Sequence, residues 1–508
     1  MLTTLKRSLL ATALLGAMVL TLPAYAGGTI KIAREADSTT FDPIISQQNP
    51  DCWIFPNIFA SLVRATPDAT KVVPNLAESW TTSADGLTYT FKLRAGLKFS
   101  DGTPIKASDV KFSILRARDT KESAWASLYS GIADITAPDD TTAVFTLKAP
   151  SAVFLANIAM FAAGIIPEAA MTKMGAEAFA QMPVVSGAYK LEEWKHGESV
   201  ILTKNPYFWN AAKVNLDRIE WLLIPNDNSR ILKLQGGEVD AAIIIPFNRV
   251  ADLQKDPKLK VHLDPSTRED HMVANFAHKP LDNKDVRQAI YQALDRKAIV
   301  DAVTFGIGEV ANSFISKGAL FYNAAQKDYP YDPEASKKLL AKAGVKLPLK
   351  LDLLIFAGDS AHEQTAVLMK DQLGKVGIEI NVVKQEAGQA FDTTSAGNYD
   401  LALNYWTNDI IDPDEKTAFS VYGDDVTKSY YTNYKNEEVT KLVDASRTEL
   451  DEAKRQAIYY KIQQTVKDDI HWIDLYYSPY RNVSAAYVKN FTQNPLGGWS
   501  LEETTIEK

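Results

Sequence analysis

The chain has little of the chemistry that builds cross-links or metal sites. Its 508 residues include one cysteine, Cys52, which excludes an internal disulfide. The six histidines lack the close spacing that zinc sites use, since the nearest two are His271 and His278. Stability must therefore come from burial of apolar side chains, for which roughly 480 mature residues suffice, in two or three domains. We expect no metal and no cofactor.

Motifs for nucleotide binding and covalent catalysis are also missing from the sequence. No Gly-x-Ser-x-Gly elbow, phosphate loop or dinucleotide fingerprint occurs. Ser360 and His362 lie beside Asp359, but a nucleophile and its base usually come from separate elements. We interpret this trio as a loop or helix cap. Nothing in the sequence requires an enzyme, although a secreted hydrolase or peptidase stays an alternative.

The amino terminus is typical of a secretory signal. Lys6 and Arg7 are followed by an apolar stretch without charge, and a small-x-small pattern ends at Ala26. Residues 1–26 are therefore predicted to be a cleaved signal peptide. No second long apolar segment follows, so we expect no membrane span. The mature protein is predicted to be soluble outside the cytoplasm.

The charge balance argues against nucleic acid as a partner. The formal net charge is −8, and removal of Lys6 and Arg7 with the signal leaves −10. An acidic protein with scattered charges is soluble and poorly suited to bind nucleic acid or anionic lipid. We expect a soluble monomer.

Apolar periodicity predicts an α/β fold. The early part resembles a small domain of hairpins, with alternating strands at 87–94 and 142–147 and with Ser108 capping a helix that runs to about Arg118. Later, strands are predicted at 349–355, 378–383 and 399–404, with a helix at 361–376 between the first two. Strand-helix-strand spacing of this kind implies parallel pairing.

One loop combines an aromatic side chain with an acid. Trp406 and Asp409 follow the strand predicted at 399–404, and Asp412 with Pro413 then stops regular structure. In an open α/β sheet, ligands bind beyond the carboxyl ends of strands. An aromatic wall beside a carboxylate suits a ligand with a cationic group and an apolar body. The plain alternative is a solvated acidic turn.

Longer motifs are spread over nearly the whole mature chain. They occupy residues 85–91, 93–104, 107–113, 205–209, 234–240, 286–290, 294–296 and 331–334. Together they resemble the extracytoplasmic solute-binding proteins of ABC importers, in family 5, the cluster with dipeptide- and oligopeptide-binding proteins. Each motif alone is weak, and the set is specific.

The resemblance implies a bilobed periplasmic-binding-protein fold. Two α/β lobes are joined by two crossing strands, which we place near 275–280 and 477–482. The first lobe then comprises residues 27–277 and 480–508, with a small inserted domain at about 62–185, and the second lobe comprises 278–479. The implied function is a periplasmic receptor that closes around a peptide and delivers it to an ABC permease complex in the inner membrane.

The resemblance also implies a binding site between the lobes. In peptide-binding members, the loop that matches Trp406 places an acid three residues later, and this acid holds the peptide's α-amino group. That acid is Asp409 here. A polar loop from the other lobe contacts the ligand backbone. The predicted ligand-binding residues are Tyr405, Trp406, Asn408, Asp409, Gln47, Gln48 and Asn49.

The sequence departs from the dipeptide-binding members at one position that matters for cargo. Some of them carry an arginine after the strand that resembles 349–355, and it pairs with the ligand carboxylate. Residues 356–362 contain no arginine here. Because fold does not fix the ligand, an opine, an amine, an oligosaccharide, nickel or haem are alternative cargoes, and a periplasmic chaperone is an alternative role.

Overall fold

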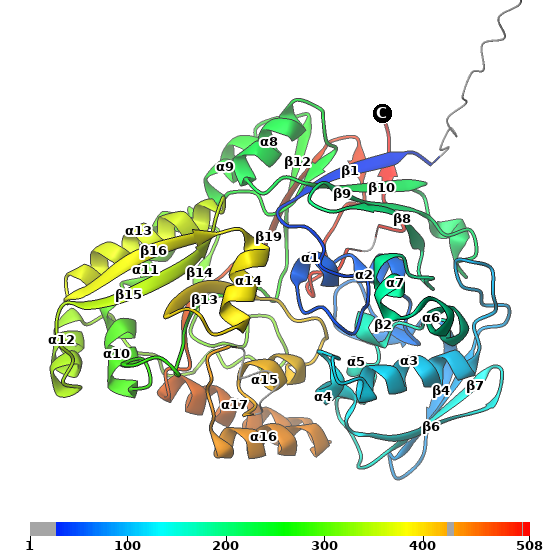
Figure 1. The fold of residues 1–508 in the computed structure, drawn as a ribbon, viewed down its shortest axis with the longest axis horizontal. Coiled ribbons are helices and arrows are strands. Elements are labelled where there is room, and N and C mark those ends of the chain that lie inside the picture. Colours follow the sequence, from blue (N-terminus) through cyan, green and yellow to red (C-terminus); the bar gives the residue numbers. More distant parts are fainter. Residues whose placement is uncertain (1–26, 424–430, 500) are drawn as a thin grey trace, which may run out of the picture.

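Two lobes lie side by side, and each is built on its own β-sheet (Figure 1). The computed structural model describes residues 27–423, 431–499 and 501–508, so the predicted signal peptide at 1–26 lies outside the described residues. The described carboxyl terminus lies beside strand β1 in the first lobe (Figure 1). Among the described residues, no helix combines the length and apolar character that a membrane crossing needs.

The first lobe is organised around a seven-stranded sheet. Its strand β1 runs parallel to β10 and β11, while β9, β8, β19 and β12 extend the sheet antiparallel. Helices α1 (Asn49–Cys52) and α2 (Phe55–Ile58) follow β1. The strands, in sheet order, are β12 (Leu259–Asp264), β19 (Tyr480–Ala485), β11 (Ala241–Ala242), β1 (Thr29–Arg34), β10 (Arg218–Leu223), β9 (Ser199–Lys204) and β8 (Tyr189–Lys195).

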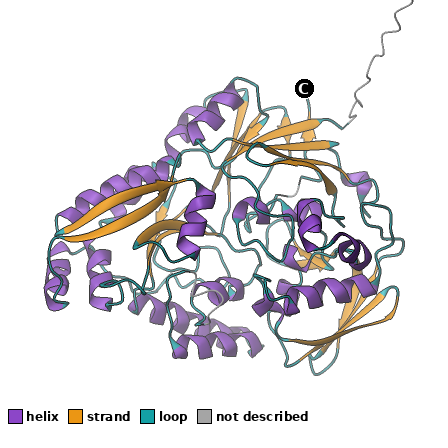
Figure 2. Ribbon diagram, in the orientation of Figure 1, coloured by secondary structure: helices purple, strands orange, loops and turns teal. Residues whose placement is uncertain are grey.

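The second lobe has a six-stranded sheet with helices packed around it (Figure 2). Strand β15 runs parallel to both β16 and β17, which confirms the parallel pairing predicted from the strand-helix-strand spacing. Helix α13 (Ser360–Gly374) joins β15 to β16. The strands, in sheet order, are β14 (Glu309–Val310), β18 (Trp472–Tyr477), β13 (Glu269–Ala274), β17 (Leu401–Trp406), β15 (Leu349–Phe356) and β16 (Ile378–Gln385).

The remaining helices surround these sheets. Those of the first lobe, besides α3 of its small domain, are α4 (Ala126–Tyr129), α5 (Phe154–Asn157), α6 (Glu168–Met174), α7 (Ala176–Gln181), α8 (Asp227–Gln235) and α9 (Phe247–Leu253). Those of the second lobe are α10 (Lys284–Ala293), α11 (Arg296–Thr304), α12 (Pro333–Lys342), α14 (Ala387–Ser395), α15 (Asp414–Ser420), α16 (Glu437–Thr448) and α17 (Glu452–Asp468).

The chain passes between the sheets at two short segments. Strand β12 belongs to the first sheet and β13 to the second, so the first crossing spans residues 265–268. Strand β18 belongs to the second sheet and β19 to the first, so the second crossing spans 478–479, within the expected 477–482. The first crossing differs from the expected 275–280. Both flanking segments are strands, and only their distant partners decide which sheet each one joins.

A small four-stranded sheet lies within the region 62–185. Strands β4 (Ala77–Thr82), β5 (Thr88–Leu93), β7 (Thr142–Leu147) and β6 (Ile132–Asp139) pair antiparallel, and helix α3 (Ala107–Asp119) packs across β6 and β7. The prediction that Ser108 caps this helix is wrong. The cap residue is Lys106, whose backbone N–H donates to the Asp109 carboxylate at 2.9 Å, because an acid at the third helical position can satisfy that free donor.

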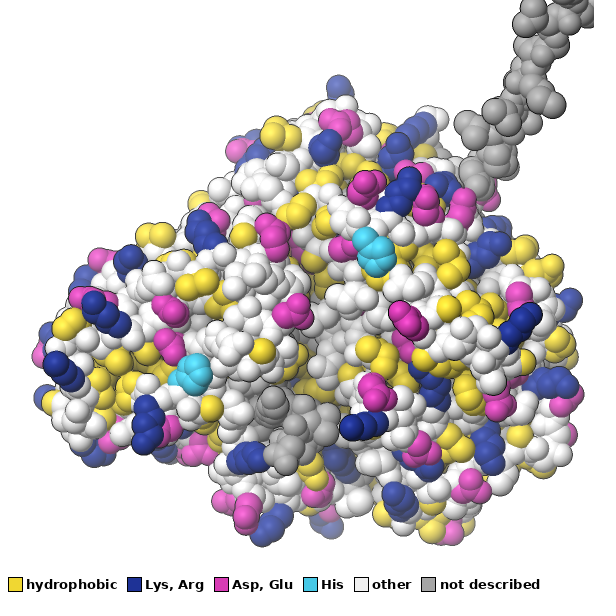
Figure 3. All heavy atoms as spheres, in the orientation of Figure 1, with side chains coloured by type: hydrophobic (Ala, Val, Ile, Leu, Met, Phe, Trp, Pro, Cys, Tyr) yellow, Lys and Arg dark blue, Asp and Glu magenta, His cyan; other side chains and the backbone are white. Residues whose placement is uncertain are grey.

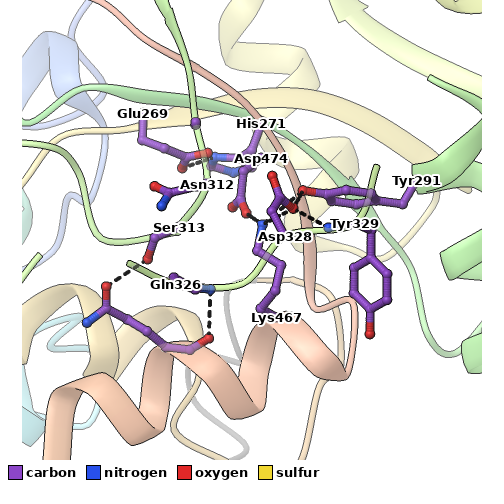
Figure 4. A network of polar contacts seen from close by, with 12 residues as sticks. Glu269, His271, Tyr291, Asn312, Ser313, Gln326, Asp328, Tyr329, Lys467 and Asp474 are labelled. Atoms are coloured by element: carbon purple, nitrogen blue, oxygen red, sulfur yellow. Dashed lines mark hydrogen bonds and ion pairs between the residues drawn. The ribbon is translucent and has the colours of Figure 1, made fainter. Parts of the chain in front are cut away.

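A network of buried charges holds the second lobe together (Figure 4). Lys467 of α17 pairs with Asp474 of β18, and its Nζ lies 2.9 Å from the Tyr291 hydroxyl and 3.3 Å from Asp328. Burial opposes the charged form of Lys467, but Asp474 and Asp328 raise its pKa above the ordinary value. Arg296 also pairs with Asp328. The four charges therefore compensate one another inside the lobe.

Replacement of Lys467 by Met should destabilise the protein by about 3–5 kcal/mol, because Asp474 then stays buried without the cation that pairs with it. Urea unfolding measures the loss. Lys461→Met is the matched control on the same helix. Its side chain is more than half exposed beside Glu438, so its cost should stay within about 1 kcal/mol. Equal losses for the two variants would contradict the role of the network.

Candidate functional site

A pocket lies between the two sheets, where parallel strands of both sheets end. It encloses about 650 Å³, its open mouth included. Residues just beyond β1, β10 and β11 reach it from the first lobe, and residues at or beyond the ends of β15, β16 and β17 reach it from the second. Ligands bind at this edge of parallel sheets. Its lining residues are Glu35, Ala36, Pro50, Pro225, Asp227, Arg230, Ile244, Ile245, Pro246, Arg268, Phe356, Ala357, Gly358, Asp359, Ala361, Glu386, Ala387, Phe391, Tyr405 and Arg481.

Arginines in the pocket wall differ in how their charge is compensated. Arg268 makes two hydrogen bonds to Asp270, at 2.9 and 2.7 Å, and its guanidinium lies 3.7 Å from the centroid of the Tyr405 ring. Arg230 donates to four backbone oxygens, at 2.8 to 3.0 Å. Both side chains are thus fixed by the protein itself.

Acids in the wall also differ in their partners. Asp359 accepts hydrogen bonds from the backbone of Ala361 and His362, which makes it the N-cap of α13 and confirms the helix-cap interpretation of the Asp359, Ser360 and His362 trio. Glu35, by contrast, has its Oε2 atom buried without a hydrogen-bond partner in the described part of the chain. An unpartnered buried carboxylate oxygen favours a ligand that brings a donor.

Direct hydrogen bonds join the two lobes around this pocket. The Thr407 hydroxyl donates to Asn49 at 3.1 Å, and the Ser360 hydroxyl donates to Asp227 at 3.0 Å. Farther out, the rings of Trp125 and Phe419 meet edge to face, with centroids 5.0 Å apart. The structure therefore has its lobes in contact.

Tyr405 and Trp406 were expected on a loop, but they are the last two residues of β17. Successive side chains of a strand point to opposite faces. Accordingly Tyr405 lines the pocket, whereas Trp406 packs against Phe419 with ring centroids 5.9 Å apart. Trp406 was expected to form a wall of the pocket, but in this structure it is not among the residues that line it.

The other predicted residues lie near the lobe contact. The Asn49 side chain hydrogen-bonds both Tyr405 and Thr407 across the lobes. The Asn408 backbone N–H donates to the Thr267 hydroxyl in the first crossing, at 2.8 Å. The same polar loop contains two glutamines with different roles: Gln47 donates to the Ala124 carbonyl at 3.4 Å, and Gln48 is the N-cap residue of α1.

Asp409 forms a pair with a second acid, Glu415 of α15. The Asp409 backbone N–H donates to Glu415 at 2.8 Å, and the two side chains also hydrogen-bond each other. Burial and the neighbouring Glu415 hold the pKa of Asp409 well above its usual range. Within the described residues, no Lys or Arg forms an ion pair with either acid. The two carboxyl groups must then share a proton, because two adjacent buried charges of one sign repel.

This acid pair faces the first lobe rather than the outer surface. Burial first, and then the negative charge of Asp409, raises the pKa of the Cys52 thiol in α1. Asp409 also contributes to the raised pKa of Tyr480, at the start of β19. Asp409 is thus at the lobe contact, beside the pocket but not among its lining residues.

Sequence reasoning missed the charged residues that line the pocket. Arg268 is the last residue of the first crossing, Arg481 lies two positions after the second, and Glu35 directly follows β1. One signal was present for Glu35, because it follows the carboxyl end of a predicted strand. The arginines gave no such signal, since the first crossing was placed elsewhere.

Figure 3 shows Lys and Arg side chains interspersed with Asp and Glu over the face drawn. Two α/β lobes joined by two crossings around a charged pocket define a bilobed ligand-binding protein. Residues 71–428 match the profile of the bacterial extracellular solute-binding proteins, family 5 middle region. The chain belongs to this family.

Relatives cover almost the whole chain. A probable D,D-dipeptide-binding periplasmic protein of Escherichia coli is 30% identical over 477 residues, which is 92% of this chain and 91% of the relative. The periplasmic binding protein DppA of Helicobacter pylori, solved with the peptide STSA, has a TM-score of 0.87 and 27% identity, covering 95% of this chain and 98% of its own. The binding protein AgaA of A. tumefaciens, solved with agropinic acid, has a TM-score of 0.86 and 27% identity, covering 95% and 99%.

The Cys52 thiol should be nearly unreactive in the folded protein, because its raised pKa suppresses the reactive thiolate and burial blocks access. Reaction with a thiol-specific chromogenic disulfide at pH 8 should be slower by orders of magnitude than in urea. The single thiol makes the assay unambiguous. Equal rates in buffer and in urea would contradict the burial of α1 at the lobe contact.

Proposed function

We propose that this chain is a periplasmic receptor for peptides with a free amino group and that it delivers them to an ABC permease in the inner membrane. The observation that carries the proposal is the Asp409–Glu415 acid pair at the lobe contact, in which Glu415 is buried and neither acid forms an ion pair with a Lys or Arg of the described chain. An ammonium group is the ligand that such a pair can accept. The relatives that bind dipeptides and peptides support the same cargo class.

In this mechanism the peptide ammonium replaces the proton shared by the two acids. Asp409 then accepts charge-assisted hydrogen bonds, together worth on the order of 2 kcal/mol net. Tyr405 supplies an aromatic wall of the pocket, and Asn49 contacts it from the first lobe. Gln47 and Gln48 border the ligand on the same loop, and Trp406 with Asn408 fixes the segment that carries Asp409.

Closure follows from the position of the site. The pocket is assembled from residues of both lobes, so a ligand makes its full set of contacts only when the lobes meet. Ligand binding therefore shifts the equilibrium toward the closed form. The protein binds and releases its ligand without catalysing a reaction on it. It acts as a secreted monomer from which the signal peptide at residues 1–26 has been removed.

An opine is the second candidate cargo, because one solved relative holds agropinic acid at an identity similar to that of the peptide-bound relative. A thermal-shift screen separates the two. The ligands are Ser-Thr-Ser-Ala, D-alanyl-D-alanine and agropinic acid. Each is added at about 1 mM, which is on the order of the dissociation constant of a weak ligand, so that weak binding is also detected. Stabilisation by a peptide supports the proposal. Stabilisation by agropinic acid alone replaces it with the opine.

Asp409→Asn should weaken a peptide with a free amino group by about 10- to 100-fold, because the amide keeps the shape but loses the charge. Calorimetry with the peptide and its N-acetylated form measures this. The N-acetylated peptide should bind both proteins with the same low affinity. Asp371→Asn, which changes an exposed acid on α13, is the matched control and should leave both affinities unchanged. Undiminished binding by Asp409→Asn would exclude Asp409 from the site.

Affinity for an ammonium-bearing peptide should increase as pH rises above about 4, because the raised pKa keeps the ligand-free acid pair protonated at pH values where ordinary carboxyls are ionised. The folded ligand-free protein also binds more protons than the unfolded chain. The free energy of unfolding therefore falls as pH rises from about 4, the pKa of an ordinary carboxyl, to about 8, the raised pKa of Glu415. Calorimetry in two buffers of different ionisation enthalpy should detect release of a proton on binding. Release of no proton would argue against the shared-proton pair as the ammonium site.

A further inference from the structure

Arg481 lies where the pocket meets the second crossing. It is the second residue of β19, two positions after the crossing at 478–479, and it lines the pocket while only 5% of its surface is exposed. Its guanidinium stacks on Phe247, 3.5 Å from the ring centroid. A buried arginine at a pocket wall between two lobes is well placed to contact whatever occupies the pocket.

The hydrogen bonds of Arg481 leave part of its donor set unused. Nε donates to the Ile245 carbonyl at 3.1 Å, and Nη1 donates to the Ser478 hydroxyl at 3.1 Å. A guanidinium has five N–H donors. Within the described residues, Nη2 makes no hydrogen bond and no carboxylate oxygen lies within 4 Å of the guanidinium nitrogens. Arg230 and Arg268 differ, since backbone oxygens satisfy the first and Asp270 pairs with the second.

The charged groups around Arg481 do not compensate it. Burial lowers its pKa to about 10, and the positive charge of Arg268 acts in the same direction. Asp270, Asp359 and Tyr476 act in the opposite direction, but Asp270 is bound to Arg268 and Asp359 caps α13. The folded protein therefore holds a cation at a net electrostatic cost, which a ligand anion would offset.

We propose that Arg481 binds a carboxylate of the cargo, through the free donors of its guanidinium. This inference rests on the proposed function and narrows its cargo to molecules that carry an ammonium and a carboxylate, such as short peptides with both ends free. Residues 356–362 supply no arginine for this task. Arg481 supplies one from the second crossing instead, where its Nη1 and Nη2 can present a planar pair of donors to a carboxylate.

The test compares a free peptide with its carboxyl-terminal amide by calorimetry. The probes are Ser-Thr-Ser-Ala and D-alanyl-D-alanine, each as acid and as amide; neither contains another carboxylate. The wild-type protein should bind the acid about 10- to 100-fold more tightly than the amide. Arg481→Gln should lose this preference by weakening only the acid, and Arg481→Lys should retain part of it because the charge remains.

Two controls separate binding from folding. Arg218→Gln removes an arginine at the opposite end of the same sheet, where it pairs with Glu192 and Glu220, and should keep the full acid-over-amide preference. The midpoint temperature of thermal unfolding of ligand-free Arg481→Gln should be no lower than that of the wild type, because the substitution removes an uncompensated charge. If Arg481→Gln fails to fold, the wild-type and Arg481→Lys ratios decide the question.

The results divide clearly. Equal binding of acid and amide by the wild type, or an undiminished preference in Arg481→Gln, would overturn the role of Arg481 while leaving the peptide receptor intact. Failure of every peptide to bind the wild type would contradict the proposed function itself, and this inference with it.

Discussion

The cost of removing charge from water shapes both the interior of this protein and its pocket. In the second lobe, Lys467, Asp474, Asp328 and Arg296 form ion pairs with one another, so each of these charges has an opposite charge beside it inside the lobe. At the pocket the compensation is incomplete. Within the described residues, Glu35, Arg481 and the Asp409–Glu415 pair form no direct ion pair, and these are the places where cargo can change the energy of the protein.

The two crossings turn this arrangement into a device that responds to cargo. They bring the carboxyl ends of two separate sets of parallel strands to face each other, and each crossing is flanked by an arginine that lines the pocket. Arg268 is already neutralised by Asp270, whereas Arg481 is not. A fixed arginine thus lies at the first crossing and an uncompensated one beside the second. The first maintains the wall, and the second leaves a charge for the ligand.

Periodicity predicted the elements well because it reflects local physics. The strands at 349–356 and 378–385, the helix at 360–374 and their parallel pairing all agree with the sequence pattern within a few residues. The first crossing could not be found in this way, since β12 and β13 are both strands and their sheets are decided by residues far away in the chain. The predicted strand 399–404 ended two residues too early, which placed Tyr405 and Trp406 together on a loop. Both residues belong to β17, and alternation along that strand sends their side chains to opposite faces. The uncompensated state of Arg481 depends on neighbours from several elements, which no short motif records.

The edge-to-face contact between Trp125 and Phe419 lies between the small domain and α15 of the second lobe. An aromatic pair of this geometry contributes about 1 kcal/mol beyond its buried area, so it weakly stabilises the contact between the two lobes. The lobes can separate only if this ring contact is broken, and neither ring lines the pocket. The dwell time of a captured molecule is therefore set in part by two rings that never meet it, and evolution can tune release separately from recognition.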